Sequence, residues 1–445
     1  MTTATRQWET GQALHQVILT GVLPYGKEPT DVLISDGKFV SFVPSGHAPA
    51  PDTTVVDATG LIMLPGFVDL HTHLREPGGE ASETVATGTR SAAAGGFTDV
   101  FAMANTDPVT DTGEKVRYIL DLAETHAHCR VHPVGAITKG LEGLEPAPYA
   151  EMANAGARMF SDDGRCVNNA ALTRDAMLAA ARLDCVLAQH AQSGDLAGAG
   201  QINAGPAAES TGLPPWLGVA EETIIARDAI LAAETGARLH VCHISTRRSA
   251  DIIRWAKSQG WPVTAEVTPH HLLLSDELAA LTNTRYKVNP PLRSADDVRA
   301  LRAALLDGTI DAVATDHAPH TDNAKAGHWC DAPFGMTGLE TALPVVAKVL
   351  DEAQALDWGK VAELMSVTPA RIGGISSFAG RPLAAGEPAT FTLIDSTGWT
   401  VNPENRYSKS ANNPFEGTTF RHKVVATSLQ GRLIHTLSEG LTSTP

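Results

Sequence analysis

Two histidines one residue apart stand at the end of an apolar segment in GFVDLHTHLREPG, residues 66–78. If this segment is a β-strand, its side chains alternate between two faces, so His71 and His73 point the same way and Thr72 points opposite. Arg75 lies two residues further along the same face. Two imidazoles on one face could bind a metal ion, relay a proton or coincide by chance, and the motif by itself leaves all three open.

Residue types that bind metals also follow other apolar segments of the chain. Such residues are commoner on protein surfaces than at the ends of apolar strands, so chance is a poor explanation. Histidines and carboxylates without cysteine suit zinc or a similar divalent ion, and six ligands exceed the four of one tetrahedral zinc. A carboxylate could therefore bridge two ions, and Asp316 is the natural base beside them. The further candidates are Asn105, Asp162, Asp163, His190, His243, Asp316, His317 and His320.

These residues need a framework that brings distant segments to one place. Eight candidate strands alternate with amphipathic helical segments such as residues 82–96, 172–183, 220–236 and 294–308. This alternation predicts an α/β fold, a (β/α)8 TIM barrel, whose functional residues lie at the carboxyl ends of its strands. The predicted strands are residues 66–71, 98–105, 130–137, 157–163, 185–191, 238–245, 263–271 and 311–318.

The two ends of the chain differ from its middle. Residues 14–65 and 376–445 contain short alternating segments separated by Gly, Pro and Asp, which are typical of antiparallel strands. We expect both ends to form one small β-sandwich domain beside a barrel that spans residues 66–375, with residues 1–13 as a polar tail.

The composition limits the classes of function. The 445 residues are 43% apolar and 19% charged, as in ordinary soluble globular proteins, and the net charge of −16 argues against nucleic-acid or anionic-membrane partners. No segment has the ~18 consecutive apolar residues of a membrane span, and the N-terminus lacks the apolar core of a secretory signal. The five scattered cysteines form no CxxC pair, which favours a cytoplasmic protein with reduced thiols.

A series of motifs points to a known family. DLHTHLREPG, MANTDP, FSDDG, QHAQ, VCHIST, VTPHHLLL, KVNPPLR, ATDHAPHT and APFGMTGLET follow one another within about residues 55–375. They resemble the dihydroorotases of the amidohydrolase superfamily, and most of all the bacterial type I enzymes. HxH with TDHAP would indicate the superfamily alone, whereas HLREPG with NPPLR and APFG is far more specific.

The resemblance implies a zinc-dependent cyclic amidohydrolase that reversibly cyclises N-carbamoyl-L-aspartate to L-dihydroorotate in de novo pyrimidine (UMP) biosynthesis. It implies two zinc ions per subunit, one held by His71, His73 and Asp316 and the other by His190 and His243. A hydroxide bridging the metals would attack the ring amide, with Asp316 as the general acid and base.

The bridging carboxylate is expected on the fourth strand. Asp163 is preferred to Asp162, because alternation lets only one of the pair point inward and the family's spacing from HxH favours the second. Some relatives bridge their metals with a carboxylated lysine, and Lys139 is the only lysine between Lys115 and Lys257. Because FSDDG supplies acid where those relatives need lysine, Lys139 is the less favoured bridge.

Substrate-binding residues are implied by the same resemblance. Arg75 offers a planar fork for the substrate carboxylate. Asn105 and Asn289 can pair with a carboxylate or with the ring amide. The remaining implied contacts are His73, His320 and the backbone of Phe334 and Gly335.

Other polar residues have simpler structural interpretations. His270 is expected to make a structural hydrogen bond, His240 to line the barrel wall, and His317 to point away from the metals. Two interpretations of Arg293 stay open: it binds an anion, or it is a solvated arginine in a loop. Two interpretations also stay open for residues 323–335, a movable lid or a fixed loop.

Two rival functions are weaker. Hydantoinases and allantoinases open related cyclic amides, but the lack of a well-placed lysine counts against them. A catalytically silent homologue that serves as a scaffold for aspartate transcarbamoylase would have lost metal ligands, whereas the whole set is present. We expect a homodimer, and an active enzyme could still associate with aspartate transcarbamoylase.

Overall fold

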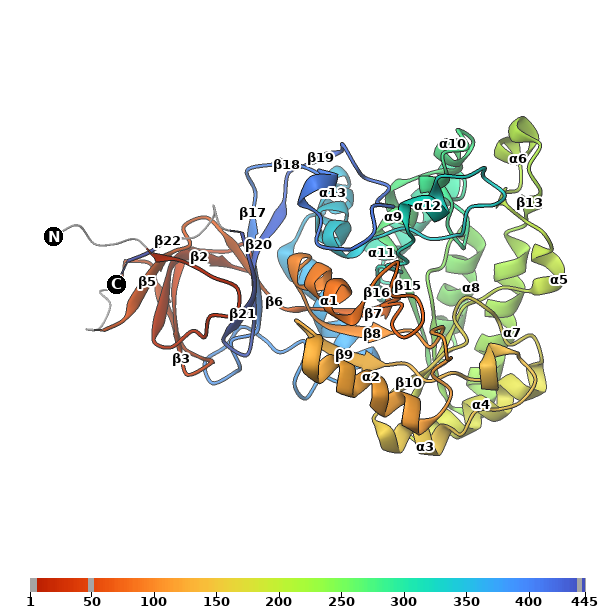
Figure 1. The fold of residues 1–445 in the computed structure, drawn as a ribbon, viewed down its shortest axis with the longest axis horizontal. Helices are drawn as coiled ribbons and strands as arrows, with labels where there is room; N and C mark the ends of the chain where they lie inside the picture. The colour runs from red at the N-terminus through yellow and green to blue at the C-terminus, as the bar shows by residue number, and fades with distance from the viewer. Residues whose placement is uncertain (1–5, 47–51, 438–441, 445) are drawn as a thin grey trace.

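The computed structural model describes residues 6–46, 52–437 and 442–444. Segments from the two chain ends, red and dark blue in Figure 1, form a sheet-rich part at one end of the molecule. The middle of the chain forms a larger part in which strands and helices alternate. Within the described residues, no helix is both long and apolar enough to cross a membrane.

The larger part is a barrel of parallel strands. These are β7 (Phe67–Thr72), β8 (Phe97–Ala102), β9 (Arg130–Pro133), β10 (Met159–Phe160), β11 (Val186–Gln189), β14 (Arg238–Val241), β15 (Val263–Val267) and β16 (Ala312–Val313). They pair in the orders β7-β8-β9 and β10-β11-β14-β15-β16. Parallel bridges from Gly135 to Phe160 and from Thr72 to His317 close the ring. The predicted eight-stranded barrel is confirmed.

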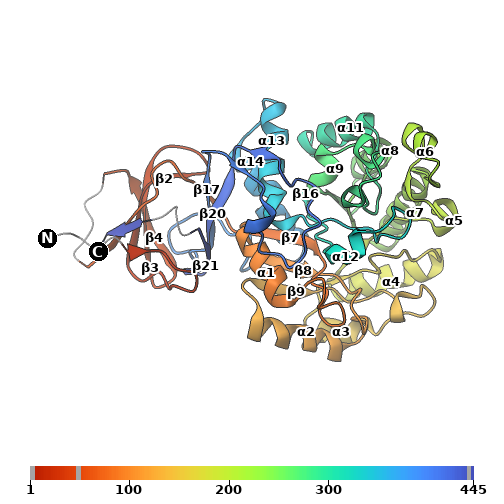
Figure 2. The same ribbon diagram turned by 45° about the horizontal axis from the view of Figure 1, so that its top comes forward.

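Helices cover the outside of the barrel (Figure 2). Hydroxyls of Thr84, Thr246 and Ser294 accept a backbone N–H of the first turn and fix where three of them begin. The long helices are α1 (Val85–Ala94), α2 (Gly113–His126), α4 (Ala170–Arg182), α7 (Val219–Thr235), α8 (Arg247–Ser258), α11 (Ala295–Leu306) and α13 (Ala342–Glu352). The short ones are α3 (Tyr149–Ala155), α5 (Gly194–Ala197), α6 (Pro206–Thr211), α9 (Pro269–Leu273), α10 (Asp276–Ala279), α12 (Asp322–Lys325), α14 (Trp358–Ala362) and α15 (Thr368–Ile372).

The sheet-rich part joins both chain ends, as predicted. Its strands are β1 (Arg6–Gln7), β2 (Val17–Pro24), β3 (Thr30–Ser35), β4 (Lys38–Pro44), β5 (Thr54–Asp57), β6 (Ile62–Pro65), β17 (Phe391–Asp395), β20 (Lys423–Leu429), β21 (Arg432–Thr436) and β22 (Thr442–Thr444). In the described parts of the chain they belong to one sheet, which has an apolar core of its own.

Part of the polar tail predicted for residues 1–13 is ordered against the sheet-rich part. Arg6 and Gln7 pair with β22, and Trp8 is only 2% exposed because it packs into the core of the sheet. Residues 1–5 lie outside the described part of the chain.

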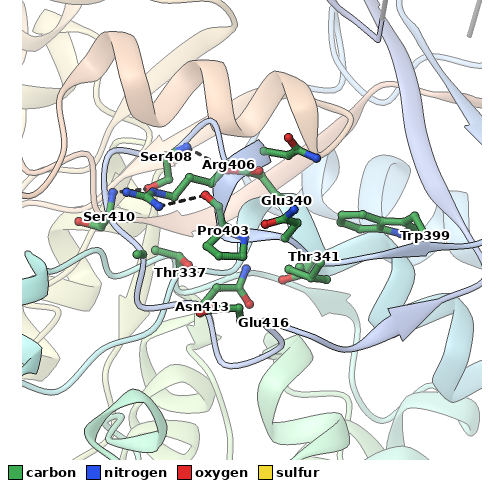
Figure 3. Close-up of a pocket in the computed structure, with 14 residues that line it drawn as sticks. Thr337, Glu340, Thr341, Trp399, Pro403, Arg406, Ser408, Ser410, Asn413 and Glu416 are labelled. Carbon is green, nitrogen blue, oxygen red and sulfur yellow. Dashed lines mark hydrogen bonds between the residues drawn. The ribbon is translucent and has the colours of Figure 1, made fainter. Parts of the chain in front are cut away.

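One stretch of the predicted end domain lies against the barrel instead. The strands β18 (Trp399–Thr400) and β19 (Thr419–Phe420) pair, and the chain between them contacts the barrel. Figure 3 shows a pocket at this contact, lined by Glu340 and Thr341 of the barrel and by Pro403 and Ser408. We refer to residues 406–416 as the 406–416 segment. The predicted barrel, residues 66–375, is therefore also contacted by a segment that comes later in the chain.

Candidate metal centre and substrate pocket

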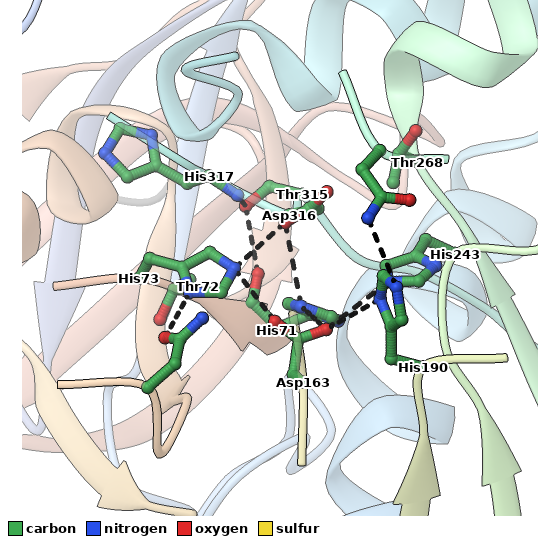
Figure 4. Close-up of polar contacts among 12 residues, drawn as sticks. His71, Thr72, His73, Asp163, His190, His243, Thr268, Thr315, Asp316 and His317 are labelled. Atoms are coloured by element: carbon green, nitrogen blue, oxygen red, sulfur yellow. Dashed lines mark hydrogen bonds and ion pairs between the residues drawn. The ribbon is translucent and has the colours of Figure 1, made fainter. Parts of the chain in front are cut away.

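Six acidic and histidine side chains from five strand ends meet at the carboxyl end of the barrel (Figure 4). Their common neighbour is Asp163, which follows β10. Its carboxylate oxygens lie 3.2 Å from His71 Nε2, 3.3 Å from His73 Nε2, 3.3 Å from His190 Nδ1 and 3.4 Å from His243 Nε2. Asp316 Oδ1 lies 3.1 Å from His73 Nε2 and 3.6 Å from His71 Nε2. All six residues are buried.

The cluster fits metal ions in its donor chemistry. Three groups of ligand atoms are compact enough to hold an ion: His71 with His73 and Asp163, Asp163 with His190 and His243, and His71 with Cys242 and Glu266. Asp163 belongs to the first two groups, so one carboxylate could serve two ions. His71 Nε2 is close to two carboxylates, yet neither is aligned for a hydrogen bond, and this buried nitrogen has no partner among the described residues. Such an atom suits a metal better than a proton.

Acceptors behind the histidines determine which ring nitrogen faces the cluster. Glu266 Oε1 lies 3.1 Å from His71 Nδ1, and Asn105 Oδ1 lies 2.9 Å from His73 Nδ1. These oxygens only accept, so each holds the ring proton on Nδ1 and leaves the Nε2 lone pair for the cluster. Gln192 Oε1 does the same for His190 through Nε2 at 2.8 Å.

Glu266 and Gln192 are functional candidates that the sequence analysis missed. Glu266 is fully buried in β15 and also contacts His240 Nε2 at 2.9 Å. The sequence signal was an acidic residue on the Thr264 face of the barrel strand VTAEV. Gln192 was visible in QHAQ, two residues after His190.

The backbone is strained at three of the site residues. Arg75, His243 and Asp316 have φ angles of 62°, 33° and 45°, in the left-handed region that side chains with a Cβ rarely adopt. Such conformations persist where surrounding contacts enforce them, and they concentrate at functional sites. Beside Asp316, the Thr315 amide donates to the buried Asp69 at 2.9 Å, which helps to fix this strand end.

The electrostatics of the cluster favour a cation. Burial acts to raise the pKa of Asp163, but the charge of His71 and hydrogen bonds from His190 and His243 bring it well below the ordinary value. Burial acts to lower the pKa of His71, but Asp163 brings it well above the ordinary value. Protons on imidazoles thus balance the carboxylates, and a bound divalent ion would balance them in the same way.

A cavity of about 340 Å³ opens directly over the cluster. Every residue predicted to bind substrate lines it, so the structure brings the two predicted sets together. They are His73, Arg75, Asn105, Asn289, His320, Phe334 and Gly335.

Side chains around the cavity are held by neighbouring groups. Arg75 Nε donates to the carbonyl of Pro319 at 3.2 Å, and Asn289 Nδ2 donates to Gln192 Oε1 at 3.0 Å. Burial and the charge of Arg75 lower the pKa of His320 to about 3, so its ring is neutral at physiological pH. Its Nε2–H donates to the Phe334 carbonyl at 2.7 Å, and Nδ1 keeps a free lone pair.

The alternatives for the bridging residue occupy different surroundings. Asp162 turns away from the cluster and accepts the amides of Ile137 at 2.7 Å and Thr138 at 2.9 Å. Lys139 lies in a largely exposed ion pair with Glu145 at 3.0 Å. Only Asp163 among these candidates contacts the histidines.

Three other histidines considered in the sequence, His240, His270 and His317, lie outside the compact ligand groups. His240 contacts Glu266 and Thr264 in the barrel interior, and His317 contacts Glu83 at 3.3 Å and accepts the Gly338 amide. The hydrogen bond expected for His270 is not found at Nε2, which has no partner in the described chain; burial lowers the pKa of this ring to about 4.

Arg293 corresponds to neither of its two interpretations. It is 2% exposed and donates to Ser245 Oγ, Asn203 Oδ1 and the Trp216 carbonyl, each at 3.0 Å. It therefore braces the chain that follows His243 rather than facing solvent or the cavity.

Comparison with known proteins agrees with this geometry. A family model described as Dihydro-orotase-like matches residues 60–249. A dihydroorotase of Streptomyces coelicolor is 50% identical over 94% of this chain and 98% of its own, and one of Mycobacterium tuberculosis is 47% identical over 94% and 97%. The chain belongs to the dihydroorotase family.

A solved structure supports the fold of this dihydroorotase family member. The L-hydantoinase (dihydropyrimidinase) from Arthrobacter aurescens matches with a TM-score of 0.84 over 95% of this chain and 96% of its own, at 24% identity. This similarity confirms the barrel fold. At that identity it carries no information on which cyclic amide this chain opens.

Proposed function

We propose that the protein is a dihydroorotase that interconverts N-carbamoyl-L-aspartate and L-dihydroorotate in pyrimidine biosynthesis. The observation that carries the proposal is that one cavity joins the acid–histidine cluster to Arg75. A cyclic amide that bears a carboxylate fits that combination, because the cluster faces the amide and a guanidinium pairs with the carboxylate. Curated relatives named dihydroorotase support the same assignment.

We propose that His71, His73 and Asp316 hold one divalent ion, that His190 and His243 hold a second, and that Asp163 bridges them. Zinc is the proposed metal, since imidazole and carboxylate ligands suit it. Bound ions would lower the pKa of water and polarise the amide carbonyl.

Asp316 is the proposed proton carrier of the reaction. In ring opening, its carboxylate accepts a proton from the attacking water and delivers it to the departing ring nitrogen. In ring closure the same carboxyl takes the proton from that nitrogen and returns it to the leaving oxygen. Because the open form must gain a proton to condense, acid favours the ring.

The opposite wall of the cavity orients the substrate in this proposal. Arg75 binds the ring carboxylate, and Asn105 and Asn289 present amide groups to it or to the ring. The neutral His320 offers Nδ1 as an acceptor for a ring N–H. The Phe334–Gly335 backbone lines the same wall and completes it.

The test is a comparison of three cyclic amides. Purified protein should open dihydroorotate and leave hydantoin and allantoin essentially untouched, since neither presents the carboxylate that Arg75 binds. Turnover confined to hydantoin or allantoin would overturn the proposal. The same sample should contain two metal ions per chain.

We further propose a cytoplasmic homodimer. All five cysteines are free thiols, which suits a reducing compartment. The dimer, and an association with aspartate transcarbamoylase, remain predictions that molar-mass measurement and co-purification would check.

A further inference from the structure

The cavity wall that carries Arg75, His320 and Gly335 is braced from behind by the 406–416 segment. This segment is itself anchored at two carboxylates of the barrel, those of the buried Glu83 and the partly buried Glu340. Glu340 accepts the amides of Tyr407 at 3.0 Å and Ser408 at 2.9 Å, and Glu83 accepts the amide of Lys409 at 3.1 Å. The segment therefore reaches the pocket as a fixed support.

Asn412 is the residue of this segment that touches the wall. It is 4% exposed, and its Nδ2 donates to the carbonyls of Ala318 and Gly335, both at 3.1 Å. Its Oδ1 accepts the amide of His320 at 3.2 Å. The side chain thus uses both of its donor hydrogens and its acceptor on two separate stretches of the wall.

The wall needs such a link because its own backbone pairing stops at this point. The Ala318 amide donates to the Met336 carbonyl at 2.7 Å, whereas the next amide on the same side of the chain, that of His320, donates to Asn412 Oδ1. A Cβ at Gly335, where φ is 145°, would lie 2.7 Å from the Ala318 carbonyl oxygen. The two stretches therefore approach closely, and Asn412 joins their backbones.

Three proposed substrate contacts depend on these two stretches. The carbonyl of Pro319 accepts from Arg75 Nε at 3.2 Å, and His320 Nε2 donates to the Phe334 carbonyl at 2.7 Å. A shift of either stretch would move the guanidinium, the imidazole and the Phe334–Gly335 backbone together.

We propose that Asn412 is a positioning residue for substrate binding, which sets the distance between the 318–320 and 334–335 stretches and so aligns Arg75 with His320. The inference rests on the function proposed above. It gives a role in the barrel's active site to a residue that follows the barrel in sequence and lies within the predicted end domain.

The experiment compares Asn412→Ala and Asn412→Asp with the neighbouring control Asn413→Ala. Asn413 caps the amide of Phe415 and makes no described hydrogen bond to the wall. For dihydroorotate we expect Asn412→Ala to raise KM at least about tenfold with kcat within about threefold, because buried carbonyls lose their donor while the proton carrier is untouched. Asn412→Asp should raise KM further, since a carboxylate repels the two carbonyl oxygens. Asn413→Ala should keep both constants within about twofold.

Metal content and hydrogen exchange separate positioning from general damage. Metal per chain should stay unchanged in all variants, and the amides of residues 318–322 should exchange faster in the Asn412 variants alone. Unchanged KM in Asn412→Ala, or a loss of metal with a matching fall in kcat, would overturn the inference. If the wild type does not turn over dihydroorotate, the proposed function fails, and unchanged exchange at the His320 amide would then refute the bracing separately.

Discussion

The acid–histidine cluster and the substrate wall face each other across one cavity, but they are built differently. The cluster is attached to the ends of barrel strands, as His71 and His73 are at β7, and its geometry follows from the barrel. The wall consists of loop backbone around His320 and Gly335, linked by a side chain from residue 412. Strands position the groups that do chemistry, and contacts between distant segments position those that recognise substrate.

The comparison predicts that changes in the cluster affect metal content and rate, while changes in the wall affect KM. The largest effect is expected for Asp163→Ala. Removing the carboxylate shared by both ligand groups should abolish binding of at least one metal and lower kcat by at least about a thousandfold.

Metal analysis beside a turnover assay would check this. Asp162→Asn is the matched control, because Asp162 contacts Ile137 and Thr138 and not the histidines. Equal metal loss in the two variants would show that the assignment of the bridge is wrong.

On the wall, Arg75→Met should raise KM for dihydroorotate by about 10- to 100-fold, the loss expected for a charged hydrogen bond to a carboxylate. Metal content should not change. Arg75→Lys should recover part of the binding, because lysine keeps the charge without the planar fork. If a variant lost metal in proportion to its activity, Arg75 would act through the metal cluster, and the predicted difference between cluster and wall would be wrong.

A smaller effect is expected at Glu266, behind the cluster. Glu266→Gln keeps the shape but weakens the hold on the His71 and His240 rings, so metal affinity should fall by about 10- to 100-fold. Titration of the metal-free protein with zinc would measure it. Thr264→Val, one step further from the cluster, should change affinity much less, and equal effects would argue for general loosening of the barrel.

The smallest effect concerns stability behind the wall. Lys325 Nζ donates to the carbonyls of Thr284, Lys287 and Pro333 at 3.0, 3.1 and 2.9 Å, and burial and then the neighbouring Lys287 lower its pKa to about 7. An unfolded lysine keeps its proton to about pH 10.4, so between these values the unfolded chain binds more protons and stability rises with pH.

Lys325→Met should flatten that rise. Urea unfolding midpoints at about pH 6 and about pH 9, for wild type and variant, would measure it. An identical pH dependence in both proteins would mean that Lys325 does not titrate in this range.

The difference between the strand-borne cluster and the loop-built wall also explains what the sequence could predict. Six of the eight barrel strands lie within the predicted ranges, and β7 and β8 each extend one residue beyond theirs, to Thr72 and to Phe97. The agreement follows because apolar strands alternating with amphipathic helices leave few other folds. The cluster follows from that, since the carboxyl ends of parallel strands meet. Strand alternation turns only one of Asp162 and Asp163 inward, and the preference for Asp163 came from the spacing of the family that the motifs resemble.

The wall could not be predicted in the same way. Asn412 lies far along the chain in a stretch whose turn-rich pattern resembles the rest of the end domain, and nothing local signals that it contacts Ala318. The buried Arg293 and Lys325 also contradict the usual preference of charged residues for the surface. Lys325 donates to three backbone carbonyls, and Arg293 donates to one carbonyl and to two side chains distant in sequence, so neither leaves a local sequence pattern.

The most direct test of the account is Asp316→Asn, assayed for metal content and for dihydroorotate turnover in both directions. Asparagine preserves the shape and can still offer an oxygen to a metal, but it cannot carry the proton. We predict that metal remains bound while the rate falls by about 100- to 10,000-fold in each direction. Near-normal rates with both metals in place would contradict the assignment of Asp316 and the mechanism built on it.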